Sequence, residues 1–548
     1  MTLLNEALNG KEHKNISPFD SDRAKHLSVA AKAEILQGWL IDKLSEILEI
    51  EASQIDVSQD FEEYGLDSAE AINLSGDLED YLGCRLSPTL LWDYQNIEAL
   101  AQYLAANTFG DNKLNGERNL ELVCSNGSIT SEELTLEGIK GDYELEIPPE
   151  NYNFADFPEY KKLQAQQQQV ASLGNGNPFF VPQETVVNDK TTVDGRELIN
   201  FATYNYIGMC GDPVVSQAAK DATDRYGTSA CASRLISGEK PLHRELEREI
   251  ADFIGAEDSI VMVGGHATNV TTIGHLFGKN DLVIYDALSH NSILQGCFLS
   301  GASLVAFAHN DPDSLETILR DRRHRYQRVL IVIEGVYSTD GDIAELPKFI
   351  ELKKRYKTFL MVDEAHSMGT IGKTGRGIGE YFAINPHDVD LWMGTLSKSF
   401  ASCGGYIAGS YALVEYLKYT APGFVFSVGM SPPNAAATLA AIRVLKNEPT
   451  RVSDLQANAK LFLALAQEKG LNTGMSQDSP VIPIIVGDSL KSIQLSQNLF
   501  KRGINVPFMI YPSVPQNEAR LRFFVTCNHT EAQIRLTIDT IAEELVKL

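Results

Sequence analysis

Two stretches of the sequence decide the fold, FLMVDEAH at residues 359–366 and WMGTLSK at residues 392–398. The first is an apolar segment that leads into the carboxylate Asp363, and the second ends in Lys398, 35 residues after Asp363. In α/β sheets, ligands bind at the carboxyl ends of the strands, where both side chains would lie. Taken singly, Asp363 could be a strand-end cap and Lys398 an exposed lysine. Together they indicate a site that uses an amine beside a carboxylate.

Outward from these stretches, apolar runs alternate with helical patterns from about residue 178 onward. The runs are at residues 259–263, 282–285, 329–333, 359–362 and 406–408, and a helical stretch such as KFIELKKRY separates most of them. This alternation predicts a mainly parallel α/β sheet covered by helices. We expect a large subdomain over about 210–450 and a smaller C-terminal α/β subdomain over about 451–548.

Other polar motifs follow apolar runs in the same half of the chain. VGGHATN at 263–269 predicts a strand, a glycine turn and a helix start, which can present backbone N–H groups to a phosphate. DALSH at 286–290 and EGVYSTDGD at 334–342 also follow apolar runs, and ARLR at 519–522 adds two arginines. A guanidinium there has the bidentate geometry that a carboxylate favours.

In this order the motifs resemble those of the α-oxoamine synthases, a family of fold-type I pyridoxal phosphate (PLP) enzymes. The resemblance covers about residues 155–548. It implies that PLP forms a Schiff base with Lys398, which is also catalytic, and that an amino acid and an acyl thioester are the substrates. Because the family's active site lies at a dimer interface, it also implies a homodimer.

The resemblance assigns the remaining roles residue by residue. It implies that Asp363 pairs with the pyridine nitrogen, His366 contacts the ring hydroxyl, and His290 stacks on the ring as a second catalytic residue. For the phosphate it implies the backbone amides of Gly265 and His266, the hydroxyl of Thr395, and Ser427 reaching across to the partner subunit. Ser338 would lie near the ring, Arg522 would hold the amino-acid carboxylate, and Ser513 would contact the substrate.

Two departures from the family pattern bear on the substrate. Residues 203–208 read TYNYIG where the family has Ser-Asn-Asp-Tyr-Leu-Gly, which is closer to the serine palmitoyltransferase branch. His266 stands where an aromatic residue is commoner. The amino acid remains open between serine, alanine and glycine.

The N-terminal region predicts a small all-α bundle over residues 31–106. Apolar residues follow helical spacing over 31–48 and 97–104, and a further helix should begin near Ser68. The segment FEEYGLDSAEAINL at 61–74 can be a capping box, with Asp67 as N-cap and Glu70 three residues later. In its bundle it also resembles the acyl and peptidyl carrier family, most closely the carriers of polyketide synthases.

The carrier resemblance covers about residues 33–106 and implies 4′-phosphopantetheine on Ser68. A phosphopantetheinyl transferase and an acyl-loading enzyme would then be partners. The carboxylates Glu70, Asp77 and Glu79 offer a docking face for basic patches. We expect a flexible N-terminus over 1–30 and a linker over 107–154, followed by a docking segment with aromatic residues around 151–163.

Composition limits the other possibilities. A net charge of −26 and a pI of about 4.9 argue against nucleic acid or an anionic membrane surface as partners. No apolar run is long enough to span a bilayer, and the first residues do not resemble a signal peptide. Seven irregularly spaced cysteines without a CxxC motif indicate reduced thiols in a cytoplasmic protein, with no metal site. The basic run at 320–325 is interpreted as a solvated helix end.

The sequence therefore predicts a PLP-dependent decarboxylative condensation of an amino acid with an acyl thioester on the fused carrier, giving an α-amino ketone. Two alternatives stay open. One is another fold-type I enzyme, an aminotransferase or a lyase, since these use the same aspartate and lysine. The other is a non-catalytic carrier scaffold with a decayed enzyme domain.

Overall fold

A computed structural model describes most of the chain: residues 28–48, 50–64, 66, 68–82, 86, 90–107, 147–172, 177–511, 513–515 and 517–548. The flexible N-terminus, most of the predicted linker and the proposed N-cap Asp67 lie outside these residues. In the described part, no helix is long and apolar enough to cross a membrane.

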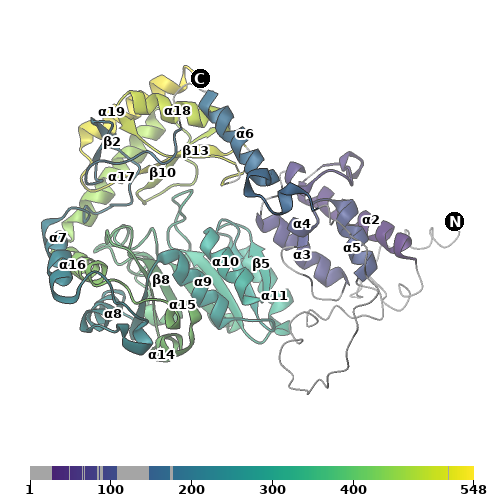
Figure 1. Cartoon of the computed structure of the whole chain (residues 1–548), viewed down its shortest axis with the longest axis horizontal. Helices are drawn as coiled ribbons and strands as arrows, with labels where there is room; N and C mark the ends of the chain where they lie inside the picture. Colours follow the sequence, from purple (N-terminus) through teal and green to yellow (C-terminus); the bar gives the residue numbers. More distant parts are fainter. Residues whose placement is uncertain are drawn as a thin grey trace, which may run out of the picture.

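A seven-stranded sheet forms the centre of the large subdomain (Figure 1). Its strand order is β3-β9-β8-β7-β6-β4-β5, and only β9 runs antiparallel to its neighbours. The strands are β3 (Asp258–Met262), β4 (Leu282–Asp286), β5 (Ser303–Phe307), β6 (Val329–Glu334), β7 (Phe359–Asp363), β8 (Leu391–Thr395) and β9 (Gly405–Gly409). The predicted mainly parallel sheet is confirmed.

Helices bury both faces of this sheet, and consecutive strand residues alternate between two apolar cores. In β6, Ile331 packs in one core with α7, α8, α11, α12 and α16, while Val332 packs in the other with α9, α10, α14 and α15. Burial on both faces explains why the parallel strands are continuous apolar runs rather than alternating ones. The helices are α7 (Pro213–Tyr226), α8 (Pro241–Ile254), α9 (Gly265–Leu276), α10 (Asn291–Ser300), α11 (Pro312–Arg322), α12 (Leu346–Tyr356), α14 (Tyr411–Thr420), α15 (Pro422–Val425) and α16 (Pro432–Asn447).

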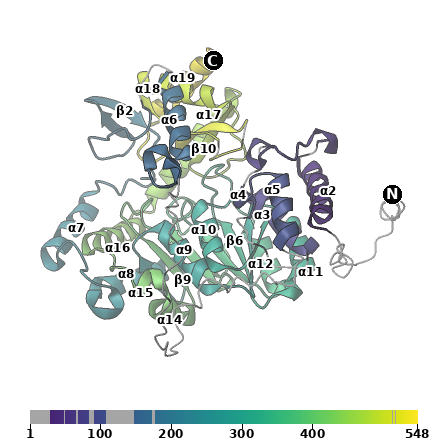
Figure 2. The same ribbon diagram turned by 45° about the vertical axis from the view of Figure 1, so that its right-hand side comes forward.

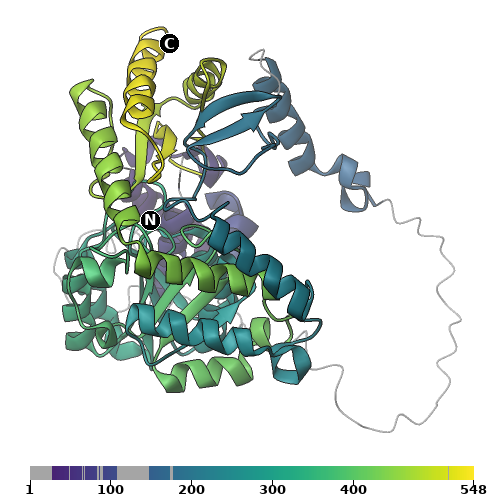
Figure 3. The same ribbon diagram turned by 90° about the vertical axis from the view of Figure 1, so that its left-hand side faces the viewer.

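The smaller subdomain is built from both ends of the enzyme part. Its C-terminal elements are α17 (Thr450–Glu468), β10 (Val481–Gly487), α18 (Ser489–Lys501), β11 (Ile504–Asn505), β12 (Phe508–Met509), β13 (Ala519–Phe524) and α19 (Glu531–Leu545). The hairpin β1 (Lys190–Val193) and β2 (Arg196–Asn200) joins them, because β2 pairs with β11. Figure 3 shows this hairpin beside the C-terminal helices.

The carrier region is a separate helical bundle with its own apolar core. It consists of α2 (Val29–Leu48), α3 (Ser68–Leu82), α4 (Leu90–Asp93) and α5 (Ile97–Asn107). Leu36, Leu40 and Leu44 of α2 are fully buried, as their helical spacing predicts, whereas Ile35 is exposed. Figure 2 shows the bundle beside the large subdomain.

Helix α6 (Pro158–Ser172) follows the linker, after two short turns. The sequence predicts that aromatic residues here pack on the next domain. This is wrong for Tyr152 and Phe154, which are 69% and 81% exposed in the chain itself. Further on, Phe179 does contact Phe508 of the small subdomain edge to face, with ring centroids 5.4 Å apart.

The carrier core offers a matched pair of stability tests on α2. Leu40→Ala empties a fully buried site and should destabilise the bundle by about 2–5 kcal/mol. Gly38→Ala, two residues away, meets no atom within 4 Å and should instead stabilise the helix by roughly 0.5–1 kcal/mol. Amide hydrogen exchange of α2 and α5 in the full chain, read by mass spectrometry, should speed up in the first variant and slow down in the second. Equal protection in both would contradict the packing described.

Candidate active site

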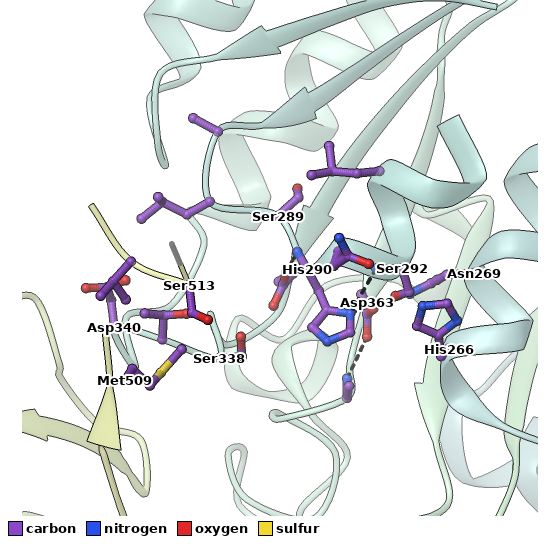
Figure 4. A pocket seen from close by; sticks show the side chains of 18 of the residues that line it. His266, Asn269, Ser289, His290, Ser292, Ser338, Asp340, Asp363, Met509 and Ser513 are labelled. Carbon is purple, nitrogen blue, oxygen red and sulfur yellow. Dashed lines mark hydrogen bonds between the residues drawn. The ribbon is translucent and has the colours of Figure 1, made fainter. Parts of the chain in front are cut away.

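Most of the predicted site residues line one cavity of about 1120 Å³ at the carboxyl end of the central sheet (Figure 4). Its wall includes residues that follow β4, β6, β7 and β8, together with the start of α9 and the β12–β13 region of the small subdomain. The predicted site residues that line it are Gly265, His266, His290, Ser338, Asp363, His366, Thr395, Lys398, Ser513 and Arg522.

Asp363 lies at the last position of β7 and is only 4% exposed. Its Oδ2 accepts a hydrogen bond from Asn269 Nδ2 at 2.8 Å, and its Oδ1 accepts one from the Ala365 amide at 2.9 Å. Asn269 Nδ2 also donates to Ser292 Oγ, which in turn lies 2.8 Å from His290 Nδ1. These bonds fix the carboxylate and link it to the imidazole, as Figure 4 shows.

Lys398 follows β8 and faces the same cavity. Desolvation lowers the pKa of Lys398 from 10.5 to about 8, although the carboxylates of Asp363 and Glu334 oppose the shift. Its Nζ lies 5.4 Å from the centre of the Tyr204 ring. At pH 7 about one in ten such amines is neutral, and only the neutral form is nucleophilic.

Two histidines face this lysine from different elements. His366 is 4% exposed, and its Nδ1 lies 2.8 Å from the Tyr206 hydroxyl. Burial holds the pKa of His366 well below its usual value, and the Lys398 charge acts in the same direction. Desolvation against the cavity wall also lowers the pKa of His290, while the Asp363 carboxylate opposes that shift. Both rings are therefore neutral at pH 7.

The start of α9 forms a tight cradle with the end of β8. A Cβ on Gly265 would come within 2.6 Å of Thr395 Oγ1, so only glycine lets this turn approach the threonine. Thr395 Oγ1 also lies 2.8 Å from Ser397 Oγ. Helix N-termini with adjacent hydroxyls bind phosphate groups. An amine, a buried carboxylate and this cradle lining one cavity together fit PLP.

The two arginines of β13 have different surroundings. Arg520 is 1% exposed and forms ion pairs with Asp340 and Glu518. Arg522 Nη1 donates to the Ser338 carbonyl at 2.8 Å, but its buried Nε has no hydrogen-bond partner among the described residues. A buried donor without an acceptor is costly, and a substrate carboxylate would supply one. The structure thus separates a structural arginine from one available to a ligand.

Two predicted residues are not brought into this arrangement. Ser427 lies in a separate small cavity with Arg234 and Phe424, away from Lys398 of the same chain. Ser68 is the first residue of α3, but its side chain lies outside the described atoms.

Three residues with evident roles in the site were not predicted. Asn269 and Glu334 were quoted in motifs without a role, and Tyr204 was noted only as a departure. Glu334 accepts a hydrogen bond from the His290 amide at 2.6 Å and so fixes the loop after β4. Its position directly after an apolar run, like that of Asp363, was the available signal.

The carrier bundle contributes part of the same cavity wall. Phe61, Leu66, Ala71 and Leu91, with polar neighbours, line it opposite the enzyme residues. Leu66 and Ala71 lie on either side of Ser68 in the sequence. The start of α3 therefore faces the cavity that holds Lys398.

Comparisons with known proteins agree with both halves of this arrangement. Residues 196–541 match the family described as Aminotransferase class I and II, and residues 38–104 match the Phosphopantetheine attachment site. The 8-amino-7-oxononanoate synthase of Symbiobacterium thermophilum is 40% identical over 345 residues, 63% of this chain and 88% of the relative. Serine palmitoyltransferase 3 of Caenorhabditis elegans is 36% identical over 65% of this chain and 72% of its own.

A solved structure of SPT with PLP has 31% identity and a TM-score of 0.67, covering 70% of this chain and 97% of the other. The chain belongs to the α-oxoamine synthases, within the class I and II aminotransferase family. As an α-oxoamine synthase it is a PLP-dependent acyltransferase, and it carries a phosphopantetheine attachment domain.

The glycine turn of this α-oxoamine synthase can be tested with adjacent residues. Gly265→Ala should weaken PLP binding by about tenfold or more, because the new methyl group collides with Thr395. Gly264→Ala is the control, since its Cβ would meet no atom within 4 Å. Equilibrium titration of each apoprotein with PLP gives the dissociation constants. Equal losses in both variants would contradict the cradle.

The lowered pKa of Lys398 predicts a pH dependence for cofactor attachment. A desolvated lysine loses its proton at lower pH, so the neutral amine becomes available as pH rises through about 8 rather than through 10.5. The rate at which the apoprotein forms the visible Schiff-base absorbance with PLP should rise with a midpoint near 8. A free-lysine peptide is the control. A rate still rising steeply above pH 10 would rule out the desolvated lysine.

Proposed function

We propose that this enzyme condenses an α-amino acid with an acyl group held as a thioester on its own carrier domain, with loss of CO2. Serine or alanine is the proposed amino acid, with glycine as the third candidate. We further propose that the active form is a cytoplasmic homodimer in which Ser427 reaches the cofactor phosphate of the partner subunit. A phosphopantetheinyl transferase and an acyl-loading enzyme would prepare Ser68.

One observation carries the proposal: the start of the carrier helix and the Lys398 site line one cavity. A phosphopantetheine arm on Ser68 would begin between Leu66 and Ala71, which line this cavity, and would extend into its interior. The cavity exceeds what an amino acid and PLP need, since typical ligand pockets measure about 300–1000 Å³. The remaining room suits a thioester arm.

PLP, when bound, would supply an electron sink for the amino-acid Cα, and Asp363 would hold its protonated pyridine nitrogen. Lys398 would remove the Cα proton, which the desolvation of its amine and its pKa of about 8 support. Neutral His366 would share a hydrogen bond with the ring hydroxyl, and its contact with the Tyr206 hydroxyl holds the orientation of the imidazole. Arg522 would orient the substrate carboxylate through its unpaired Nε.

In the proposed reaction, Cα bonds to the thioester carbonyl carbon, and the carbon–sulfur bond breaks to release the pantetheine thiol. The β-keto acid product then loses CO2 and becomes an α-amino ketone. Ser338, whose carbonyl binds Arg522, and Ser513 lie on the cavity wall and would contact the amino acid.

An aminotransferase or a lyase would use Lys398 and Asp363 equally well. The attached carrier favours condensation, because neither of those reactions consumes an acyl thioester. A scaffold without catalysis is disfavoured by the lowered pKa of Lys398 and the unpaired Arg522 Nε, which a decayed site has no need to retain.

The decisive experiment compares Ser68→Ala with Ser75→Ala in the full chain. Ser75 lies on the same helix, and its buried hydroxyl has no hydrogen-bond partner among the described residues, so its loss should be tolerated. Each protein is treated with a phosphopantetheinyl transferase and acyl-CoAs from acetyl to hexadecanoyl, then with serine, alanine or glycine. We expect CO2 and carrier thiol in equal amounts from wild type and Ser75→Ala, and neither from Ser68→Ala.

Equal product from the Ser68→Ala chain under these conditions would refute the self-carrier function. Release of CO2 without thiol from the wild-type chain would instead indicate decarboxylation without condensation. The amino acid that gives both products identifies the natural substrate class.

A further inference from the structure

The outer edge of the central sheet is covered by the carrier helix. Strand β5 is the last strand on its side of the sheet, and it pairs only with β4. An uncovered edge strand would expose unpaired backbone groups. Here α3 lies along β5, and the Ala306 amide donates a hydrogen bond to Asn73 Oδ1 at 2.9 Å. Figures 1 and 2 both show α3 beside this side of the enzyme.

Gly76, one turn further along α3, lets the helix approach this edge closely. A Cβ at Gly76 would lie 3.8 Å from the Leu304 carbonyl oxygen and 3.8 Å from Arg322 Nη1. A longer side chain at this position would therefore press against the β5 backbone. Asn73 and Gly76 are three residues apart, which places them on one face of the helix.

An ion pair completes the contact. Arg322 Nη2 lies 3.3 Å from Asp77 Oδ1, with side-chain exposures of 18% and 41%. Arg322 belongs to the basic run interpreted from sequence as a solvated helix end. That interpretation is right for the exposed residues Arg320, His324 and Arg325, and wrong for Arg322, which contacts the carrier.

We propose that the edge of β5 and Arg322 form a docking surface for α3, which delivers the acyl group to Lys398 of the same subunit. This proposal rests on the proposed function. The contacts lie along α3 just after the residues that line the active-site cavity, so docking aims the Ser68 end of the helix at the cavity. The helix has about 3.6 residues per turn, which puts Ser68 roughly two and a half turns from Asp77.

The chemistry of the contact suits reversible docking. A partly exposed ion pair is weak and screened by salt, so the carrier can leave to meet its loading enzyme. The acidic face of α3 would meet that enzyme too, since phosphopantetheine must be loaded with the carrier away from the cavity. The same face of α3 would therefore contact either the edge of β5 or the loading enzyme, but not both at once.

The first test reverses one charge in the full chain, with the acyl group preloaded on phosphopantetheine. Arg322→Asp should slow single-turnover acyl transfer by about three- to tenfold, read by intact mass spectrometry. Arg320→Asp is the matched control, because Arg320 lies on the same helix, is 64% exposed and pairs with Asp321. Free acyl-pantetheine in solution, which needs no docking, should be used equally by both variants.

A second variant tests the same contact from the carrier side, in case Arg322→Asp alters the fold. Asn73→Ala removes the acceptor of the Ala306 amide without changing charge, and should also slow transfer from the carrier alone. Asp77→Arg placed in the Arg322→Asp chain should restore part of the rate. Wild-type transfer rates in both single variants would overturn the docking surface.

Delivery within one subunit is tested by mixing two inactive chains, Ser68→Ala and Lys398→Ala, and isolating the mixed assembly. The first lacks a carrier thiol and the second lacks the lysine, so delivery within a subunit predicts no product. Product from the mixture would overturn same-subunit delivery. A different outcome would refute the self-carrier function itself: the wild-type chain keeps the acyl group on its carrier but consumes free acyl-pantetheine. That outcome does not depend on the results for the Arg322 variant.

Discussion

The site depends on one buried carboxylate. Burying a carboxylate as fully as Asp363, at 4% exposure, is costly without hydrogen-bond partners, and Asn269 and the Ala365 amide supply them. Because Asn269 belongs to α9 and also binds Ser292 of α10, the same bonds fix both helices against β7. The phosphate cradle and His290 therefore take their positions from the group that would hold the cofactor ring. Loss of the Asp363 contacts would disorganise the site as well as change its charge.

Much of the fold could be predicted because parallel strands buried on both faces must be apolar. The runs at 282–285, 329–333 and 359–362 correspond to β4, β6 and β7. Strands β5 and β8 were not among the predicted runs. Strand β5 is the short segment SLVAF, whose residues Leu304 to Phe307 alternate between the two apolar cores. Strand β8, LWMGT, is interrupted by Gly394 and ends in the polar Thr395. The β1–β2 hairpin could not be assigned to the small subdomain, since its pairing with β11 spans about three hundred residues of sequence.

The predicted site residues fall into two groups for a physical reason. Residues that follow strands, such as Asp363 and Lys398, meet because parallel strands end at one edge of the sheet. Asn269 acts by a hydrogen bond to Asp363 from inside a helix, and such a bond leaves no spacing signal in one sequence. Glu334 ends a strand as Asp363 does, so its position was visible in the sequence, but its hydrogen bond to the His290 amide was not. Arg520 and Arg522 are two residues apart on β13 and so lie on one face of the strand, which is why sequence alone could not exclude Arg520. The ion pair of Arg520 with Asp340 excludes Arg520 as the residue that holds a substrate carboxylate.

The carrier contact changes how the two halves of the chain relate. Fusion alone raises the local concentration of the acyl group, whatever the orientation of the carrier. A helix seated on β5 adds orientation, because Asn73 meets a backbone amide of the central sheet and Asp77 meets the partly exposed Arg322 at the end of α11. It also covers a sheet edge whose unpaired backbone groups could otherwise pair with strands of other molecules. An edge strand covered by a removable helix is exposed whenever the carrier leaves. Because β5 has only five residues, it offers little edge for pairing with strands of other molecules when the carrier leaves. It still presents α3 with a backbone donor and acceptor.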